Sequence, residues 1–171
     1  MKASTLFSTE NLIVRHWISE DLPAILKVYG DPDAMKWVGD GSVLTQTQAE
    51  KWLAVTARNY EKRGYGMFTI LEKKSEQIIG FGGLVHPGEQ VEVEVKYAYL
   101  RDFWGRGFAS EFIQALLKYA KSKLSITNII ATTHPENEAS KKVLTKSGFV
   151  LEKEVLNDDG TFTSLFRWTS E

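Results

Sequence analysis

The spacing of apolar and polar residues along the first third of the chain predicts one strand and two helices. Leu12–Trp17 alternates between the two classes, which is typical of a strand with one buried face. Acidic residues just after Ser19 favour a helix start there, because the positive end of the helix dipole stabilises carboxylates. The helices are predicted from Ser19 to the turn Gly30-Asp31-Pro32, and from Thr45 or Thr47 to Lys62 before Gly64.

Strands dominate the middle of the chain. Three runs separated by polar or Gly/Pro turns predict consecutive strands at Met67–Glu72, Ile78–Val85 and Val91–Leu100. The third run alternates almost perfectly, so its side chains should divide between the two faces of a sheet. One face would carry Val91, Val93, Val95, Tyr97 and Tyr99, and the other Glu92, Glu94, Lys96 and Ala98.

The last third predicts a helix, a strand, a short helix and a hairpin. Apolar residues recur at helical spacing from Phe108 to Tyr119. The following elements are a strand at Asn128–Thr132, a short helix from Pro135-Glu136-Asn137 to Gly148, and a hairpin of Phe149–Val155 with Phe162–Trp168. This order predicts a mixed α/β (α+β) fold in a single domain spanning residues 1–171. Antiparallel strands would precede a strand–helix–strand crossover.

Composition narrows the class of protein. The 171 residues are 43% apolar and 25% charged with a net charge of −1, which is ordinary globular usage and predicts no nucleic-acid partner. The chain contains no cysteine, which excludes disulfides, thiolate metal sites and a cysteine nucleophile. We see no signal peptide and no apolar run of the ~18 residues that a membrane span needs. We therefore expect a cytoplasmic protein that does not associate with membranes.

Two glycines precede the helix predicted from Phe108. Gly105 and Gly107 flank Arg106, and the small Ala109 follows in the first helical turn. Glycine lets a phosphate approach the backbone, and the free N–H groups at a helix N-terminus attract anions. The segment suits a pyrophosphate held by backbone N–H groups, but taken alone it is explained more simply by a tight turn without a ligand. It is neither GxxxxGK[ST] nor GxGxxG, which disfavours a P-loop and the usual Rossmann site.

The segment Trp-Gly-Arg-Gly-Phe-Ala-Ser-Glu at 104–111 resembles the coenzyme A loop of the GCN5-related N-acetyltransferases (GNAT). Trp104 stands where Arg or Gln is usual in the family. In this departure the segment resembles the branch of RimJ/RimL-type ribosomal-protein N-terminal acetyltransferases, although Phe112 replaces an Ala of that branch. The segments Pro-Glu-Asn-Glu-Ala-Ser at 135–140 and Lys-Ser-Gly-Phe at 146–149 resemble a second motif of the branch. The resemblance implies a mixed, mostly antiparallel twisted sheet of about seven strands flanked by about four helices.

The resemblance also implies acetyl-CoA as the cosubstrate and no metal. The pyrophosphate would be held by the backbone of Trp104, Gly105, Arg106, Gly107, Phe108 and Ala109. The Arg106 side chain would add charge or remain solvated, and Arg101 is a further candidate. The pantetheine arm would bond to the main chain of Val95, Tyr97 and Tyr99, whose side chains would belong to the core. Asn137 would contact the coenzyme and also cap the short helix, because capping uses only its side-chain oxygen.

Ser140 and Glu94 are the candidates for catalysis. Many family members place a tyrosine acid where this chain has Leu144, so the branch suggests that Ser140 donates to the leaving sulfur. A bond from Ser140 to the helix backbone is the alternative. Glu94 corresponds to an acidic residue of the branch and would take the proton of the amine through water. The alternative is a solvated or salt-bridged face with Lys96, which replaces a Gly of the branch.

The acceptor implied by the resemblance is a primary amine that attacks the thioester directly. The branch suggests a protein N-terminus, whereas a polyamine, drug or amino acid derivative is the alternative. Acidic loop residues would attract such a cationic amine: Asp31, Asp33, Asp40, Asp158 and Asp159. The loss of tyrosine at Leu144 suggests a third hypothesis, a non-catalytic acyl-CoA-binding module. A homodimer stays open, with Trp37 and Trp52 in the core, in an acceptor cleft or on a dimer face.

Overall fold

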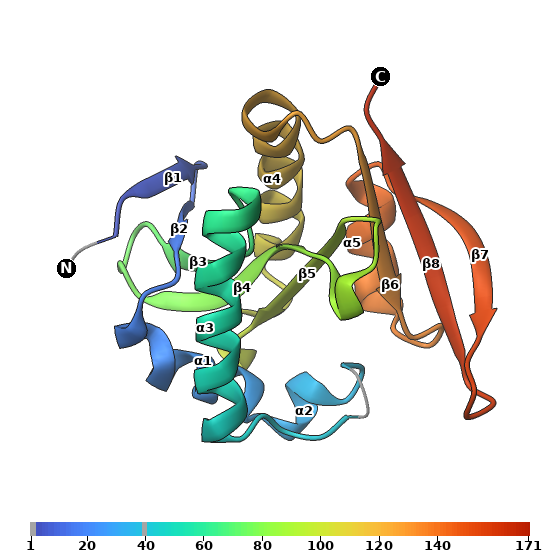
Figure 1. The fold of residues 1–171 in the computed structure, drawn as a ribbon, viewed down its shortest axis with the longest axis horizontal. Helices are drawn as coiled ribbons and strands as arrows, with labels where there is room; N and C mark the ends of the chain where they lie inside the picture. The colour runs from blue at the N-terminus through green and yellow to red at the C-terminus, as the bar shows by residue number, and fades with distance from the viewer. Residues whose placement is uncertain (1–2, 39–40) are drawn as a thin grey trace.

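One sheet of eight strands forms the centre of the protein in the computed structural model, which describes residues 3–38 and 41–171 (Figure 1). The spatial order of its strands is β1-β2-β3-β4-β5-β6-β8-β7. Neighbouring strands are antiparallel except β5 and β6, which are parallel. The strands are β1 Thr5–Ser8, β2 Leu12–His16, β3 Met67–Glu72, β4 Ile78–Val85, β5 Glu94–Tyr99, β6 Asn128–Thr133, β7 Val150–Leu156 and β8 Phe162–Thr169.

Helices cover both faces of the sheet, with α3 in front and α4 behind in the view of Figure 1. The α-helices are α1 Leu22–Tyr29, α2 Pro32–Met35, α3 Gln46–Arg63, α4 Phe108–Leu124 and α5 Glu138–Lys146. Three short 3₁₀ turns are η1 Ser19–Asp21, η2 Pro87–Glu89 and η3 Arg101–Phe103. As predicted, α3 follows a cap at Thr45 and ends at the left-handed Gly64. Within the two described ranges, no helix combines the length and the apolar character needed to cross a membrane.

The predicted fold class is confirmed, with three differences in its elements. The pattern does not predict β1 or α2, because each has only four residues, too few to show a period. The strand expected at Val91–Leu100 begins only at Glu94. Val91 is 95% exposed, so the alternation at the start of that run does not reflect burial. The described chain therefore has eight strands and five α-helices, where the resemblance implied about seven and about four.

β5 divides its side chains between two apolar clusters. Val95 and Tyr99 pack in the cluster on the α4 face, whereas Ala98 packs against the cluster beneath α1 and α3. On the neighbouring β4, a Cβ at Gly82 would lie only 2.4 Å from the ring of Phe112. Gly82 therefore makes room for the fully buried Phe112, which explains how α4 accommodates a large ring at this position.

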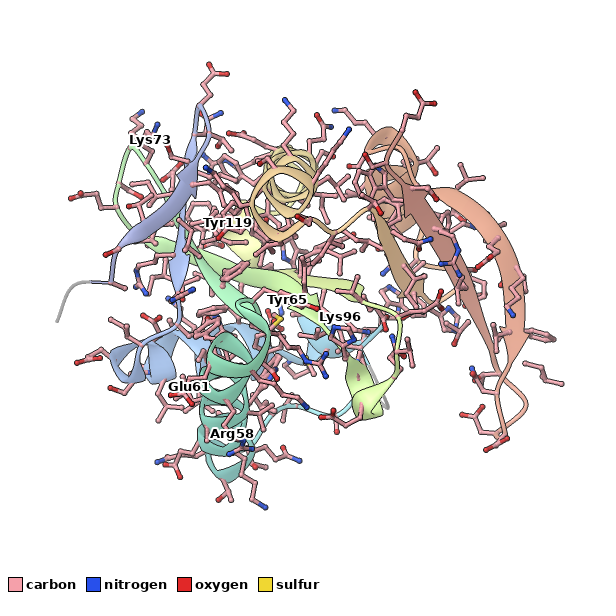
Figure 2. The ribbon with its side chains drawn as sticks, turned by 45° about the horizontal axis from the view of Figure 1, so that its top comes forward. Arg58, Glu61, Tyr65, Lys73, Lys96 and Tyr119 are labelled. Carbon is pink, nitrogen blue, oxygen red and sulfur yellow. The ribbon has the colours of Figure 1, made fainter. Side chains whose placement is uncertain are left out.

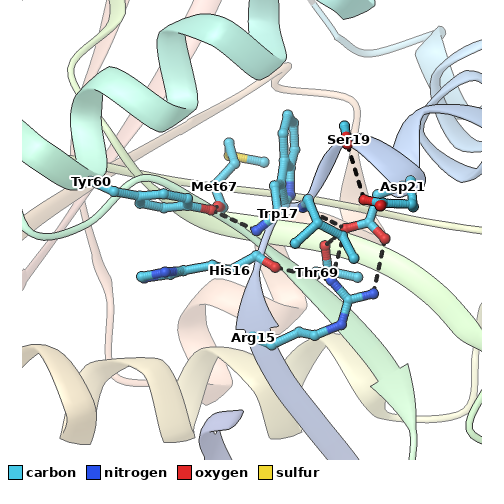
Figure 3. A network of polar contacts seen from close by, with 10 residues as sticks. Arg15, His16, Trp17, Ser19, Asp21, Tyr60, Met67 and Thr69 are labelled. Atoms are coloured by element: carbon cyan, nitrogen blue, oxygen red, sulfur yellow. Dashed lines mark hydrogen bonds and ion pairs between the residues drawn. The ribbon is translucent and has the colours of Figure 1, made fainter. Parts of the chain in front are cut away.

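A buried carboxylate ties the segment before α1 to the sheet (Figure 3). Asp21 is 2% exposed and accepts hydrogen bonds from the Arg15 guanidinium at 2.8 and 2.9 Å and from the Thr69 hydroxyl at 2.7 Å. Tyr60 of α3 donates its hydroxyl hydrogen to the C=O of Met67, and burial raises the pKa of this phenol. These contacts hold α1 and α3 against the central strands.

Candidate active site

A cleft opens where β5 and β6 separate. A single residue pair, Glu94 with Ile130, joins the two strands, and the Ile130 N–H donates to the Val93 C=O at 2.9 Å. Figure 1 shows the strands diverging beyond this point, and a cleft of about 1140 Å³ lies there. Its wall includes parts of β5, β6, the loop before α4 and the first turns of α4 and α5. This volume exceeds the roughly 300–1,000 Å³ of ordinary ligand pockets, so an extended ligand fits.

The edge of β5 that faces this cleft presents main-chain groups. The Val93 C=O bonds to β6, whereas the Leu100 N–H bonds to β4. Because the main-chain groups of successive residues point to alternate sides of a strand, the residues that face the side of β6 are Val95, Tyr97 and Tyr99. These three are the residues predicted to bond the pantetheine arm. The side chains of Val95 and Tyr99 are buried in the core as expected, Tyr97 packs against that core, and all three residues also line the cleft.

Trp104 anchors the glycine loop to this strand. Its indole N–H donates to the C=O of Tyr99 at 2.9 Å, and about half of the side chain is covered. A planar donor at this position therefore fastens the start of the loop to the end of β5. This contact is what a Trp provides at residue 104, where the resemblance leads one to expect Arg or Gln.

The loop and the start of α4 present N–H groups without a protein acceptor. Gly105 and Gly107 have φ angles of +72° and +82°, which favour glycine. Gly107 is the N-cap of α4, and no side chain caps this end. Within the described ranges, no protein group accepts a hydrogen bond from the N–H of Phe108, Ala109 or Ser110. A Cβ on either glycine would meet nothing within 4 Å, so a pyrophosphate has both donors and space here.

The two arginines near this loop have other partners. Arg106 lies 3.3 Å from a carboxylate oxygen of Glu72, with its guanidinium over two phenylalanine rings. Arg101 pairs with Asp31 at 2.5 Å and with Asp33 at 2.7 Å. Neither arginine side chain belongs to the cleft wall. The backbone N–H groups, rather than these charges, are therefore already in place for a phosphate.

Two hydroxyl groups meet at the start of α5. Asn137 caps this helix as predicted, with its Oδ1 accepting from the Ser140 N–H at 3.2 Å. The Ser140 Oγ lies 2.8 Å from the Tyr97 hydroxyl, and all three residues line the cleft. Burial raises the pKa of Tyr97 more than the bond to Ser140 lowers it, so the phenol stays protonated. Leu144, at the place of the usual tyrosine acid, is 1% exposed.

The Tyr97 side chain is the site feature that sequence reasoning missed. The pattern assigns its ring to the core and only its main chain to the coenzyme. Its partner is 43 residues away, so the hydrogen bond depends on how β5 and α5 pack. The available signal was the absence of a tyrosine at Leu144 together with a tyrosine on the strand that borders the cleft.

Glu94 is buried and has several partners. It is 3% exposed, and its carboxylate accepts from the Thr132 hydroxyl, from the Gln90 amide at 3.3 Å and from the Lys96 ammonium at 2.9 Å. Lys96 and Thr132 line the cleft, whereas Glu94 is not part of its wall. The salt bridge between Glu94 and Lys96, which was the alternative expected from the sequence, is therefore present, and its carboxylate end is buried. Among the described residues, no three His, Asp or Glu side chains gather as metal ligands.

The opposite wall of the cleft comes from α2, α3, the loop after β4 and the β7–β8 hairpin. Trp37 and Trp52 both line this wall. Asp33 also lines it and pairs with Arg101. Three other acidic residues that were expected to attract a cationic amine do not line the cleft: Asp31, Asp158 and Asp159. The fourth, Asp40, lies outside the described residues.

Proteins of known structure share this fold. RimL, a ribosomal L7/L12 alpha-N-protein acetyltransferase solved in complex with coenzyme A, has a TM-score of 0.82 at 18% identity and covers 98% of each chain. Spermidine N-acetyltransferase from Vibrio cholerae, in complex with coenzyme A and spermine, has a TM-score of 0.79 at 16% identity and covers 95% of this chain and 97% of that chain.

Sequence comparison identifies the family directly. The uncharacterized N-acetyltransferase YoaA of Bacillus subtilis is 30% identical over 150 residues, which are 86% of this chain and 84% of that protein. The family model of the acetyltransferase (GNAT) domain matches residues 11–150. Since this match spans most of the chain and includes the strands and helix that border the cleft, the chain belongs to the GNAT acetyltransferase family.

Proposed function

We propose that the chain is an acetyl-CoA-dependent N-acetyltransferase that transfers an acetyl group to a primary amine by direct attack on the thioester. The observation that carries this proposal is the cleft between β5 and β6, which ends at the uncapped N-terminus of α4. It combines an open strand edge for an extended arm with backbone donors for a pyrophosphate. This combination matches the chemistry of coenzyme A better than that of a compact nucleotide.

The backbone does most of the proposed coenzyme binding. The N–H groups of Phe108, Ala109 and Ser110 point from the helix end and would hold the pyrophosphate, aided by the dipole of α4. The turn at Gly105 and Gly107 allows the close approach that these bonds require. The pantetheine amides would pair with the edge of β5 at Val95 and Tyr97, because the Tyr99 C=O already accepts from Trp104. The Asn137 amide N–H₂, which capping leaves available, would add a side-chain contact.

The proposed chemistry moves one acetyl group and one proton. The amine nitrogen bonds to the acetyl carbon, the carbon–sulfur bond breaks, and the sulfur takes a proton while the nitrogen loses one. We assign the proton for sulfur to Ser140, supported by Tyr97, whose hydroxyl lies 2.8 Å from the Ser140 Oγ. The raised pKa of Tyr97 suits a group that must stay protonated until the thiolate forms.

Glu94 stays a prediction as the base. Its carboxylate already accepts hydrogen bonds from Thr132 and Gln90 and pairs with Lys96, so a water molecule would have to bring it the proton of the amine. These contacts directly support a different role for Glu94, which is to hold the ammonium group of Lys96 in place.

Two classes of acceptor fit the fold. The similarity to RimL suggests a protein N-terminus, and the similarity to the spermidine enzyme suggests a small amine. Both relatives are under 25% identical and therefore support the fold rather than the substrate. A non-catalytic acyl-CoA-binding module is the alternative to any acceptor, and it shares the coenzyme site.

Thermal unfolding with added ligands tests the coenzyme part of the proposal. A ligand that binds only the folded state stabilises it by RT ln(1 + [L]/Kd), about 2.7 kcal/mol at a concentration of 100 Kd. We expect acetyl-CoA and coenzyme A to raise the melting temperature strongly, and ATP to raise it little. No shift with millimolar acetyl-CoA, or an equal shift with ATP, would contradict the assigned site.

A further inference from the structure

Lys96 places a positive charge on the acceptor side of the reaction site. It lies in β5 between Val95 and Tyr97, whose main chains face the gap between the strands. Its side chain shares the strand face of Ala98, which packs against the α1 and α3 cluster. Figure 2 shows Lys96 on the side of the sheet that carries α3, away from α4 and Tyr119. The coenzyme loop leads into α4, so an acceptor would approach from the side of Lys96.

The position of this ammonium group is held by a buried carboxylate. Its Nζ lies 2.9 Å from Oε1 of Glu94, which is also fixed by Thr132 and Gln90. A carboxylate that is 3% exposed is costly to bury without a partner, so this ion pair fixes the direction of the Lys96 side chain along the cleft wall. The Lys96 side chain is nevertheless 43% exposed, and an ammonium group has three N–H donors. Donors therefore remain for a second anion inside the cleft.

The carboxylates of the cleft wall already have cationic partners. Among the described residues that line the cleft, the acidic ones are Asp33 and Glu89. Asp33 lies 2.7 Å from Arg101, and Glu89 lies 3.3 Å from Arg63. These pairs partly offset the attraction that the two lining carboxylates would exert on the second ammonium group of a polyamine. Lys96 would also repel such a group beside the thioester.

Apolar side chains complete this side of the cleft. Trp37, Trp52 and Val55 line it, and Val55 is 40% exposed. Aromatic and aliphatic walls favour an apolar substituent on the acceptor, while one fixed cation favours an anionic substituent next to the amine. Both features are found together in a free amino acid with an apolar side chain, whereas a polyamine has no anionic group for Lys96 to bind.

We propose that the acceptor is a small amine that carries a carboxylate and an apolar substituent, and that Lys96 binds this carboxylate. The inference rests on the proposed acetyl transfer and narrows its substrate class. Lys96 acts on specificity: its ammonium group forms a charge-assisted hydrogen bond with the carboxylate while the neutral amine attacks the thioester. A peptide N-terminus has an amide in place of the carboxylate next to its amine, so it would be a poorer acceptor.

Matched acceptors test this assignment. We would measure kcat/KM for L-phenylalanine and L-phenylalaninamide, for L-methionine and L-methioninamide, and for spermidine, in the wild type and in Lys96→Gln. The ratio of acid to amide is compared between the two proteins, so that the different amine basicities of acid and amide cancel. We expect the ratio to fall on the order of 10- to 100-fold in Lys96→Gln, through a higher KM for the acids and little change for the amides.

Three further variants keep the result interpretable. Lys96→Arg should retain the preference for acids because it retains the cation. Lys73→Gln removes an exposed lysine at the distant β3–β4 turn (Figure 2) and should leave the ratio unchanged. If Lys96→Gln does not fold because Glu94 is left buried without a partner, the double variant with Glu94→Gln removes that charge. Because Glu94 is also the predicted base, the acid-to-amide ratio of the double variant is measured as acceptor affinity, by calorimetric titration in the presence of coenzyme A, and not as turnover.

The outcomes separate this inference from the proposed function. An acid-to-amide ratio that is the same in the wild type and in Lys96→Gln, or better turnover of spermidine than of either amino acid, overturns the carboxylate assignment and leaves acetyl transfer standing. Absence of turnover with every amine overturns both, even if acetyl-CoA still raises the melting temperature.

Discussion

Replacing Gly107 by glutamate is expected to weaken coenzyme A binding at least about 100-fold, a loss of roughly 2.7 kcal/mol. Gly107 has a φ of +82° and caps α4 without a side-chain contact. A glutamate there would place a carboxylate beside the N–H groups proposed to bind the pyrophosphate, and it would repel the phosphates in a partly enclosed site. Calorimetric titration with coenzyme A measures the effect.

Gly64→Glu is the matched control for this prediction. Gly64 has a φ of +80°, and a Cβ there, as at Gly107, would meet nothing within 4 Å. It caps the other long helix at its C-terminus and does not line the cleft. Both variants place a residue with a Cβ in the left-handed region at a similar cost of roughly 1–2 kcal/mol, so a difference in coenzyme affinity reports the site. Equal affinity in the two variants would refute the anion site at α4.

Removing either hydroxyl of the Tyr97–Ser140 pair should lower kcat by roughly 100-fold or more, the usual contribution of a positioned proton donor. Ser140→Ala removes the proposed donor, and Tyr97→Phe removes the hydroxyl 2.8 Å from it. Neither change alters the backbone that would hold the coenzyme, so its affinity should stay close to that of the wild type. Steady-state kinetics together with coenzyme titration separate the two effects.

The double variant and a distant tyrosine serve as controls. If the two hydroxyls act as one unit, Tyr97→Phe combined with Ser140→Ala should be little slower than either single variant. Tyr119→Phe removes a hydroxyl on α4 outside the cleft and should leave kcat unchanged. An unchanged kcat in Ser140→Ala would remove Ser140 as the donor, and multiplied effects in the double variant would refute a coupled pair.

Much of the fold could be predicted because its longer elements have a clear period. The apolar face of α4 and the runs of β3 and β4 are confirmed where the pattern predicts them. The predicted start of β5 was wrong, because alternation alone does not show where pairing with a partner strand begins. Val91 lies before the point at which Glu94 pairs with Ile130, and it stays exposed.

The candidate site was predictable where it depends on local backbone and less so where it depends on packing. The glycines at 105 and 107 and the cap at Asn137 are properties of short segments, and the structure has them as expected. The pairing of Arg106 with Glu72 and of Tyr97 with Ser140 joins residues far apart in sequence. Those contacts exist only once the strands and helices are assembled, so a motif cannot reveal them.

The most direct test of the central claim is the release of coenzyme A from acetyl-CoA in the presence of primary amines, with the acetylated product identified by mass spectrometry. The proposed function predicts that thiol release requires both the protein and an amine, and that each thiol released is matched by one N-acetylated amine. Tight binding of acetyl-CoA with no acetylated product from amino acids, polyamines or peptide N-termini would contradict catalysis and would instead support a non-catalytic acyl-CoA-binding module.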